Sequence, residues 1–136
     1  LVVEKITYAG VINENPEQVT ETFSGYSDLE KNKTYETKTD GFLIVREICQ
    51  RSGAIKYRVY VSDNKTEVDN NLSDAHLGEG MCNQNSLVAS DMSDDTAVYP
   101  IPKGYYFKVK TIYHANRADY ISKWIGMGNV RPEKKQ

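Results

Sequence analysis

One stretch of the chain, residues 35–61, constrains the fold more than any other. It contains two apolar segments, each entered through a turn, at residues 39–41 and 52–53. In the first segment, residues 42–45 are all apolar, which is typical of a strand covered on both faces. In the second, residues 54–61, apolar and polar residues alternate, which indicates a strand with one solvated face. We therefore expect a hairpin at the centre of a β-sheet protein.

Alternation of this kind recurs along the chain and is clearest at residues 105–113. There Tyr105, Phe107 and Val109 fall on one face and Lys108 and Lys110 on the other. About eight such segments follow one another at intervals of roughly 8 to 12 residues. No stretch of about 10 or more residues has the apolar spacing of a helix. The pattern predicts an all-β protein, an antiparallel β-sandwich with a jelly-roll-like arrangement.

Local signals predict the smaller elements. Residues 2–9 and 19–23 have strand character, and residues 27–33 begin with a serine followed by acidic residues, which favours one or two helical turns. A second short helix is predicted at residues 73–77, within a long polar connection that covers residues 62–85. The side chains predicted to be buried in the core are Phe42, Ile44, Val59, Phe107 and Val109.

Length and charge exclude several classes of protein. A chain of 136 residues fits one domain, residues 1–136, and its start at Leu1 indicates a C-terminal fragment of a longer chain. A net charge of -2 gives no broad positive field, so we expect no nucleic-acid partner. No apolar run is long enough for membrane insertion. The one basic cluster, Arg131, Lys134 and Lys135, is interpreted as a frayed, solvated end.

Two cysteines, Cys49 and Cys82, leave two alternatives open. A bridge between them would close a loop of about 34 residues and stabilise the fold by roughly 3 to 4 kcal/mol. The interpretation we favour from the sequence is a buried thiol on a strand and an unrelated thiol in a loop.

No motif in the chain points to catalysis or to a bound metal. His76 and His114 belong to no run with the spacing of zinc ligands. The oxygen-rich segment 63–74 has ligand types suited to Ca²⁺ but lacks the order of an EF-hand, so we interpret it as a solvated loop. Cys82 and His76 are the one thiol and imidazole close in sequence, and both lie in the long polar connection. We expect no catalytic residue, no metal and no cofactor.

Tyrosine is unusually frequent, with ten residues against three Phe and one Trp. Tyr60, Tyr99 and Tyr106 fall at strand ends or on outer faces, where an aromatic ring with a hydroxyl group suits recognition of a ligand. The alternative is that such tyrosines fill subunit contacts or cross-strand pairs.

The order of motifs resembles the C-terminal head domains of phage tail fibres and related receptor-binding proteins. The resemblance extends from Tyr35 through the Asp-Gly turn at residues 40–41 to the Pro-Lys-Gly turn at residues 102–104 and the strand after it. It implies a non-enzymatic homotrimer at the tip of a fibre, on the virion, that binds a bacterial surface glycan or an outer-membrane protein. The same layout is similar to the trimeric jelly-roll of the C1q and tumour-necrosis-factor family. A further alternative is a monomeric carbohydrate-binding module of a secreted enzyme, although Trp124 is the single tryptophan.

If the resemblance holds, the loops at residues 62–85, 91–95 and 116–119 contact the receptor, because loops vary while strands hold them in place. The residues predicted to bind the receptor are Tyr60, Asp63, Asn64, Asn70, Asn71, His76, Tyr99, Asn116 and Arg117.

Overall fold

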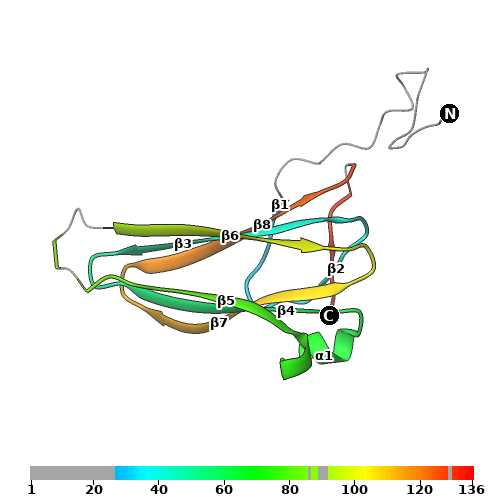
Figure 1. The fold of residues 1–136 in the computed structure, drawn as a ribbon, viewed down its shortest axis with the longest axis horizontal. Helices are drawn as coiled ribbons and strands as arrows, with labels where there is room; N and C mark the ends of the chain where they lie inside the picture. The colour runs from blue at the N-terminus through cyan, green and yellow to red at the C-terminus, as the bar shows by residue number, and fades with distance from the viewer. Residues whose placement is uncertain (1–26, 86, 89–91, 129) are drawn as a thin grey trace, which may run out of the picture.

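The computed structural model describes residues 27–136 except 86, 89–91 and 129, and these residues form two packed β-sheets (Figure 1). The strands predicted at residues 2–9 and 19–23 lie outside the described residues. The long strands are β3 (Gly41–Gln50), β4 (Ala54–Ser62), β5 (His76–Asn83), β6 (Met92–Ile101), β7 (Tyr106–Ala115) and β8 (Ala118–Gly126); the short elements are β1 (Ser27–Asp28), β2 (Tyr35–Glu36), β9 (Glu133–Lys134), the α-helix α1 (Lys65–Asp69) and the 3-10 helix η2 (Ser73–Ala75).

The strand order is that of a jelly roll. One sheet has the order β1-β8-β3-β6 and the other the order β5-β4-β7-β2-β9, and all the pairings are antiparallel. From β1 to β8, every connection except that between β4 and β5 crosses from one sheet to the other. Such crossing connections are what two interlocked Greek keys require. The predicted fold class, an antiparallel jelly-roll sandwich, is therefore confirmed. The central hairpin predicted from residues 35–61 is wrong, because β3 and β4 lie in different sheets and do not pair with each other.

The core lies between the sheets and is rich in aromatic rings. Phe107 stacks on Tyr35 from its own sheet and on Trp124 from the opposite sheet, with ring centroids 5.5 and 5.6 Å apart. Trp124 is fully buried, as is Phe107. Burial of rings of this size contributes much of the apolar stabilisation. The buried core residues are Tyr35, Leu43, Val45, Cys49, Ile55, Tyr57, Val59, Ile101, Phe107, Val109, Ala118, Tyr120 and Trp124.

The predicted core was right for Val59, Phe107 and Val109 and wrong for Phe42 and Ile44. Along β3, buried and half-buried residues alternate, so neighbouring residues face opposite sides of the sheet. Phe42 and Ile44 lie on the outer side and are only half-buried among the described residues. The continuous apolar run predicted a strand covered on both faces, and the described residues cover only one.

A disulfide joins the two sheets, since Cys49 on β3 is bonded to Cys82 on β5. The two strands belong to different sheets, and their Cα atoms are 6.1 Å apart at the bridge. The interpretation of two unrelated thiols is therefore wrong. The bridge closes a loop across 33 residues of sequence, which includes α1 and η2. It holds the edge strand β5 against the core.

The long polar connection contains more structure than its composition predicts. It begins with α1, whose first turn is capped by the Asn64 side chain, and continues through η2 into β5. The predicted helix at residues 73–77 is present only as the 3-10 turn η2. The helix predicted at residues 27–33 is wrong, because Ser27 and Asp28 instead pair with β8 as strand β1. The prediction failed because a capping serine favours a helix start without requiring one.

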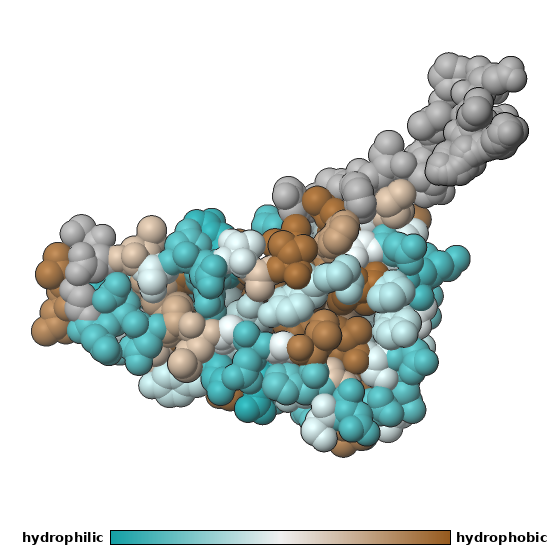
Figure 2. All heavy atoms as spheres, in the orientation of Figure 1, coloured by the Kyte–Doolittle hydropathy of each residue, from teal (hydrophilic) through white to brown (hydrophobic). Residues whose placement is uncertain are grey.

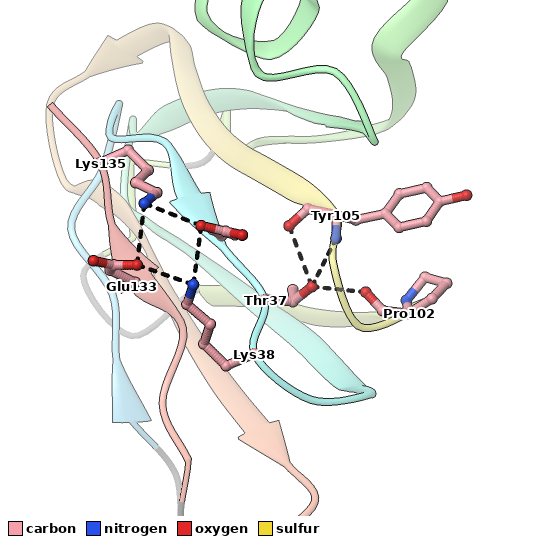
Figure 3. A network of polar contacts seen from close by, with 7 residues as sticks. Thr37, Lys38, Pro102, Tyr105, Glu133 and Lys135 are labelled. Carbon is pink, nitrogen blue, oxygen red and sulfur yellow. Dashed lines mark hydrogen bonds and ion pairs between the residues drawn. The ribbon is translucent and has the colours of Figure 1, made fainter.

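The C-terminal residues are held in place by strand pairing and ion pairs, so the frayed end predicted for Lys134 and Lys135 is wrong. Strand β9 pairs with β2. Beside it, Lys38 and Lys135 alternate with Glu36 and Glu133 in a closed ring, with nitrogen to oxygen distances of 3.0–3.1 Å (Figure 3). Hydrogen bonds from Lys135 and Lys38 hold the pKa values of both glutamates below their ordinary range.

The turn between β6 and β7 is fixed by one buried hydroxyl group. Thr37 Oγ1 accepts a hydrogen bond from the Tyr105 backbone nitrogen at 2.9 Å and donates to the Pro102 carbonyl at 2.7 Å (Figure 3).

Within the described part of the chain, no helix is long and apolar enough to cross a membrane.

Candidate functional site

The predicted receptor-binding residues around α1 lie together at one end of the sandwich (Figure 1). Asp63, Asn64 and Asn70 are exposed, and Asn71 is half-buried. Two of the asparagines have structural roles. The Asn64 carbonyl oxygen accepts a hydrogen bond from the Thr66 backbone nitrogen at 3.0 Å, and Asn70 caps the C-terminal end of the helix. These residues therefore shape the connection as well as exposing polar groups.

Tyr60, predicted to contact a receptor, is buried, with only 4% of its surface exposed. It faces away from the main core but is covered by Val68 from α1 and Ala75 from η2, which form a second small apolar cluster. Its exposure was predicted wrongly because α1 was not foreseen. His76 beside it is exposed, with the two ring centroids 5.7 Å apart.

The Tyr99 side chain faces the interior of the sandwich and is not displayed on a surface loop. It lies on β6, and a Cβ added to Gly78 on β5 would come within 2.9 Å of its ring. Its hydroxyl also hydrogen-bonds the buried Tyr57, and burial is the main reason that the pKa of Tyr57 is raised. Tyr99 thus fills the gap between the edge strands of the two sheets, which leaves it half-buried.

Asn116 and Arg117 lie at the opposite end of the sandwich from α1, in the tight turn between β7 and β8. The Asn116 side-chain amide donates to the Ser52 carbonyl at 2.9 Å, and the Arg117 carbonyl accepts from the Gln50 backbone nitrogen at 2.7 Å. Of the predicted loop at residues 91–95, residue 91 lies outside the described residues and the other four form the start of β6. The predicted site residues are therefore divided between two ends of the molecule.

The chemistry available in the described residues is limited. Cys82 is bonded to Cys49, so its thiol is not available as a nucleophile for His76. No group of three or more His, Cys, Asp or Glu side chains is placed to hold a metal among the residues that were described. Glu47 is buried next to Asp95, and burial together with that neighbouring charge raises its pKa. One of its oxygens has no hydrogen-bond partner in the described structure.

The outer side of the four-stranded sheet has an apolar patch at one end. Because side chains that pair across antiparallel strands lie side by side, Ile125, Phe42 and Pro100 form one row across β8, β3 and β6. In the next row, Ile44 lies between Lys123 and Val98. We call Phe42, Ile44, Val98, Pro100 and Ile125 the apolar face.

The apolar face continues into an open cavity of about 560 Å³ at the end of the sheet. Phe42 and Pro100 belong to both, and Met127 and Pro102 extend the apolar lining. Figure 2 looks onto the edges of the two sheets, where apolar residues lie among polar ones. Contiguous exposed apolar surface of this kind is typical of a contact with another molecule.

Charged residues around the apolar face are already paired within the domain. Arg46, one row further along the sheet, donates to Asp94 through two of its nitrogens, and Lys123 lies 3.1 Å from Asp28. Asp40, at the cavity that continues the face, accepts a hydrogen bond from the Lys103 backbone nitrogen at 2.8 Å. An apolar partner, including a second copy of the same chain, would meet no strong repulsion there.

A second hollow, of about 510 Å³, lies beside α1 and the C-terminal strand. We call it the lysine pocket. Burial lowers the pKa of the Lys108 ammonium group, which is the most enclosed of the charged groups lining it. The residues lining the pocket are Asn32, Lys33, Thr34, Asp69, Lys108, Lys134, Lys135 and Gln136.

Neither the apolar face nor the lysine pocket was identified as a site from the sequence. The run of apolar residues at 42–45 was a usable signal for the face, because it required cover on both sides of β3. The pocket had no local signal, since its lysines come from segments that lie about 75 and 25 residues apart. Comparison with known protein families, with characterised proteins and with solved structures returned no match.

Proposed function

We propose that this chain is the non-enzymatic receptor-binding head of a phage tail fibre. In this proposal three copies assemble at the fibre tip and attach the virion to a bacterial surface glycan or an outer-membrane protein. The sequence resemblance first suggested this role, and the jelly-roll sandwich is a scaffold suited to it.

The observation that carries the proposal is the apolar face. A domain with a full core of its own has no internal need for a row such as Ile125, Phe42 and Pro100 on its outer side. Val98 beside this row has 55% of its surface exposed. Packing against a second copy would remove this surface from water, at about 25 cal/mol for each Å² buried. We therefore place the contact between copies at the apolar face.

The disulfide supports a location outside the cytosol. Bridges of this kind persist at virion surfaces and in secreted proteins, whereas a reducing cytosol keeps thiols free. The bridge lies between Cys49, which is fully buried, and Cys82 on an edge strand. In a head domain exposed to the medium, such a crosslink adds stability and keeps the edge strand β5 from separating from the sheet.

The alternative of a carbohydrate-binding module has less support. Such modules usually bind sugar rings on a planar row of exposed aromatic residues. Trp124, the one tryptophan of the chain, is fully buried between the two sheets, where it stacks on Phe107. It is therefore not available for a sugar.

The test uses a matched pair of substitutions on β6. Val98→Asp places a charge on the apolar face, whereas Thr96→Asp places the same charge on the same side of the strand, in the row that contains Arg46. Fluorescently labelled wild-type protein and both variants would be incubated with a panel of bacterial strains. Wild type and Thr96→Asp should bind the same strains, and Val98→Asp should bind more weakly because it loses the gain from multivalent attachment. A wild-type protein that is monomeric and is retained by no strain would refute the proposal.

A further inference from the structure

The lysine pocket is lined mainly by lysines, although the chain has a net charge of -2. Four of its lining residues are lysines and one is an aspartate. The lysines come from the segment before β2, from the outer side of β7 and from the C-terminal strand. Lys134 pairs with Glu30, and Lys135 pairs with Glu36 and Glu133, so Lys33 and Lys108 are the pocket lysines that make no ion pair among the described residues.

Lys108 is the central group of the pocket. Its neighbours Phe107 and Val109 face the core, so Lys108 faces outward, yet it has only 7% of its surface exposed because α1 and the C-terminal residues surround it. Its ammonium group has three donors, and one of them reaches the Asp69 carbonyl at 3.0 Å. A buried ammonium group with free donors is costly unless another acceptor is supplied.

The acidic residue in the pocket does not neutralise Lys108 directly. One oxygen of the Asp69 carboxylate accepts a hydrogen bond from Thr34 at 2.6 Å, and the other accepts from Lys65 at 2.5 Å. No ion pair within 4 Å involves Lys108 in the described part of the chain. Lys108 lines the pocket, and its ammonium group has more donors than the one hydrogen bond to Asp69 uses.

The other donors of the pocket add to this arrangement. Asn32 accepts a hydrogen bond from the Thr111 backbone nitrogen through its carbonyl oxygen at 2.8 Å, so its amide NH₂ is the part left for a ligand. Lys33 makes no ion pair among the described residues, and Lys134 is held 2.7 Å from Glu30. A lysine ammonium binds as a compact point charge, which suits oxygen-rich anions such as phosphate and sulfate.

We infer that the lysine pocket binds a tetrahedral oxyanion, a sulfate or phosphate group, with Lys108 and Lys33 as its main charge partners and Asn32 as a neutral donor. The anion supplies the acceptors that the buried ammonium group lacks. The group is either a substituent of a saccharide or the free inorganic ion. The inference does not rest on the proposed assembly at the apolar face, which lies on the other sheet.

The test is a titration of the full chain followed by NMR amide shifts, with sodium sulfate compared against sodium chloride at equal ionic strength. Sulfate should cause saturable shifts at Asn32 and Lys108, and chloride should not. Lys108→Met should weaken sulfate binding by about tenfold or more, which corresponds to about 1.4 kcal/mol. Lys110→Met is the matched control, because Lys110 lies two residues along the same strand face and does not line the pocket. It should leave binding within about twofold of wild type.

A second variant keeps the test decisive if Lys108→Met does not fold. Lys33 is exposed and lies outside regular structure, so Lys33→Met should retain a wild-type spectrum and still lose sulfate affinity several-fold.

Inorganic phosphate, a sulfated monosaccharide and its unsulfated parent would then be compared. Tighter binding of the sulfated sugar than of sulfate identifies a saccharide substituent, and equal binding identifies the free ion. Shifts that do not saturate, or equal losses in Lys108→Met and Lys110→Met, would overturn the inference.

Discussion

Reduction of the disulfide between Cys49 and Cys82 should destabilise the domain by an amount that follows from its loop length. The bridge spans 33 residues of sequence. The loss of chain entropy in the unfolded state then amounts to roughly 3.7 kcal/mol at 25 °C in the chain-entropy account of crosslinks. For a chain of this size, that change lowers the melting temperature by about 10 to 20 °C.

Urea unfolding of the oxidised protein, compared with the same protein kept in a thiol reductant, measures this difference directly. The comparison changes no side chain, so packing around Cys49, which is fully buried, stays the same apart from the bond itself. The reduced protein should unfold at a lower urea concentration.

The control for the reductant is the double variant Cys49→Ala, Cys82→Ala. It should be less stable than the oxidised wild type, and the reductant should leave its unfolding midpoint unchanged. Identical unfolding curves for oxidised and reduced wild type, together with two thiols that react with iodoacetamide in the unfolded protein before reduction, would refute the bridge.

Two further predictions concern buried groups. Burial and the neighbouring charge of Asp95 raise the pKa of Glu47 above its ordinary value of 4.5. Relative to high pH, Glu47 therefore adds its full contribution to the free energy of unfolding below pH 4.5, and this contribution is lost as the pH rises through the folded-state pKa. Glu47→Gln should therefore match wild type in urea unfolding near pH 4 and exceed it at pH 8; an equal stability difference at both pH values would contradict the raised pKa. Phe107→Ala should cost about 3 to 5 kcal/mol of unfolding free energy, since Phe107 is fully buried. Phe42→Ala should cost clearly less, because Phe42 is half-buried on the outer side of β3; equal costs in calorimetry would show that the two faces of β3 were assigned wrongly.

Much of the fold was accessible from the sequence because strand alternation is a local property. The segments at residues 54–61 and 105–113 alternate clearly, and both Val59 and Phe107 lie in the core as predicted. Register in a half-solvated strand is fixed by which residues must be buried. At Tyr113 a bulge between β4 and β7 interrupts this regularity, so Tyr113 is exposed although it shares the parity of Phe107.

Features that depend on contacts between distant segments were not accessible in the same way. Nothing near Cys49 in the sequence indicates that β5 passes over it, because the partner strand belongs to the other sheet. Helix α1 was missed since it has only five residues, although Asn64 at its cap and Glu67 in its first turn are suitable start signals. Its presence in turn buries Tyr60.

The candidate surfaces differ in the same respect. The run of apolar residues around Phe42 and Ile44 predicted that both sides of β3 are covered by other residues. Only the fold shows that the outer side of β3 belongs to the apolar face. In contrast, Lys33 and Lys108 lie 75 residues apart and neither is unusual in its local sequence. Their proximity arises from the pairing of β2 with β7.

The most direct test of the proposed head domain is its mass in solution, measured by light scattering on wild type and on Val98→Asp. The account predicts a wild-type mass of three 15.4 kDa chains, a single-chain mass for Val98→Asp, and a wild-type mass for Thr96→Asp. A wild-type protein with the mass of one chain at all concentrations would contradict assembly through the apolar face.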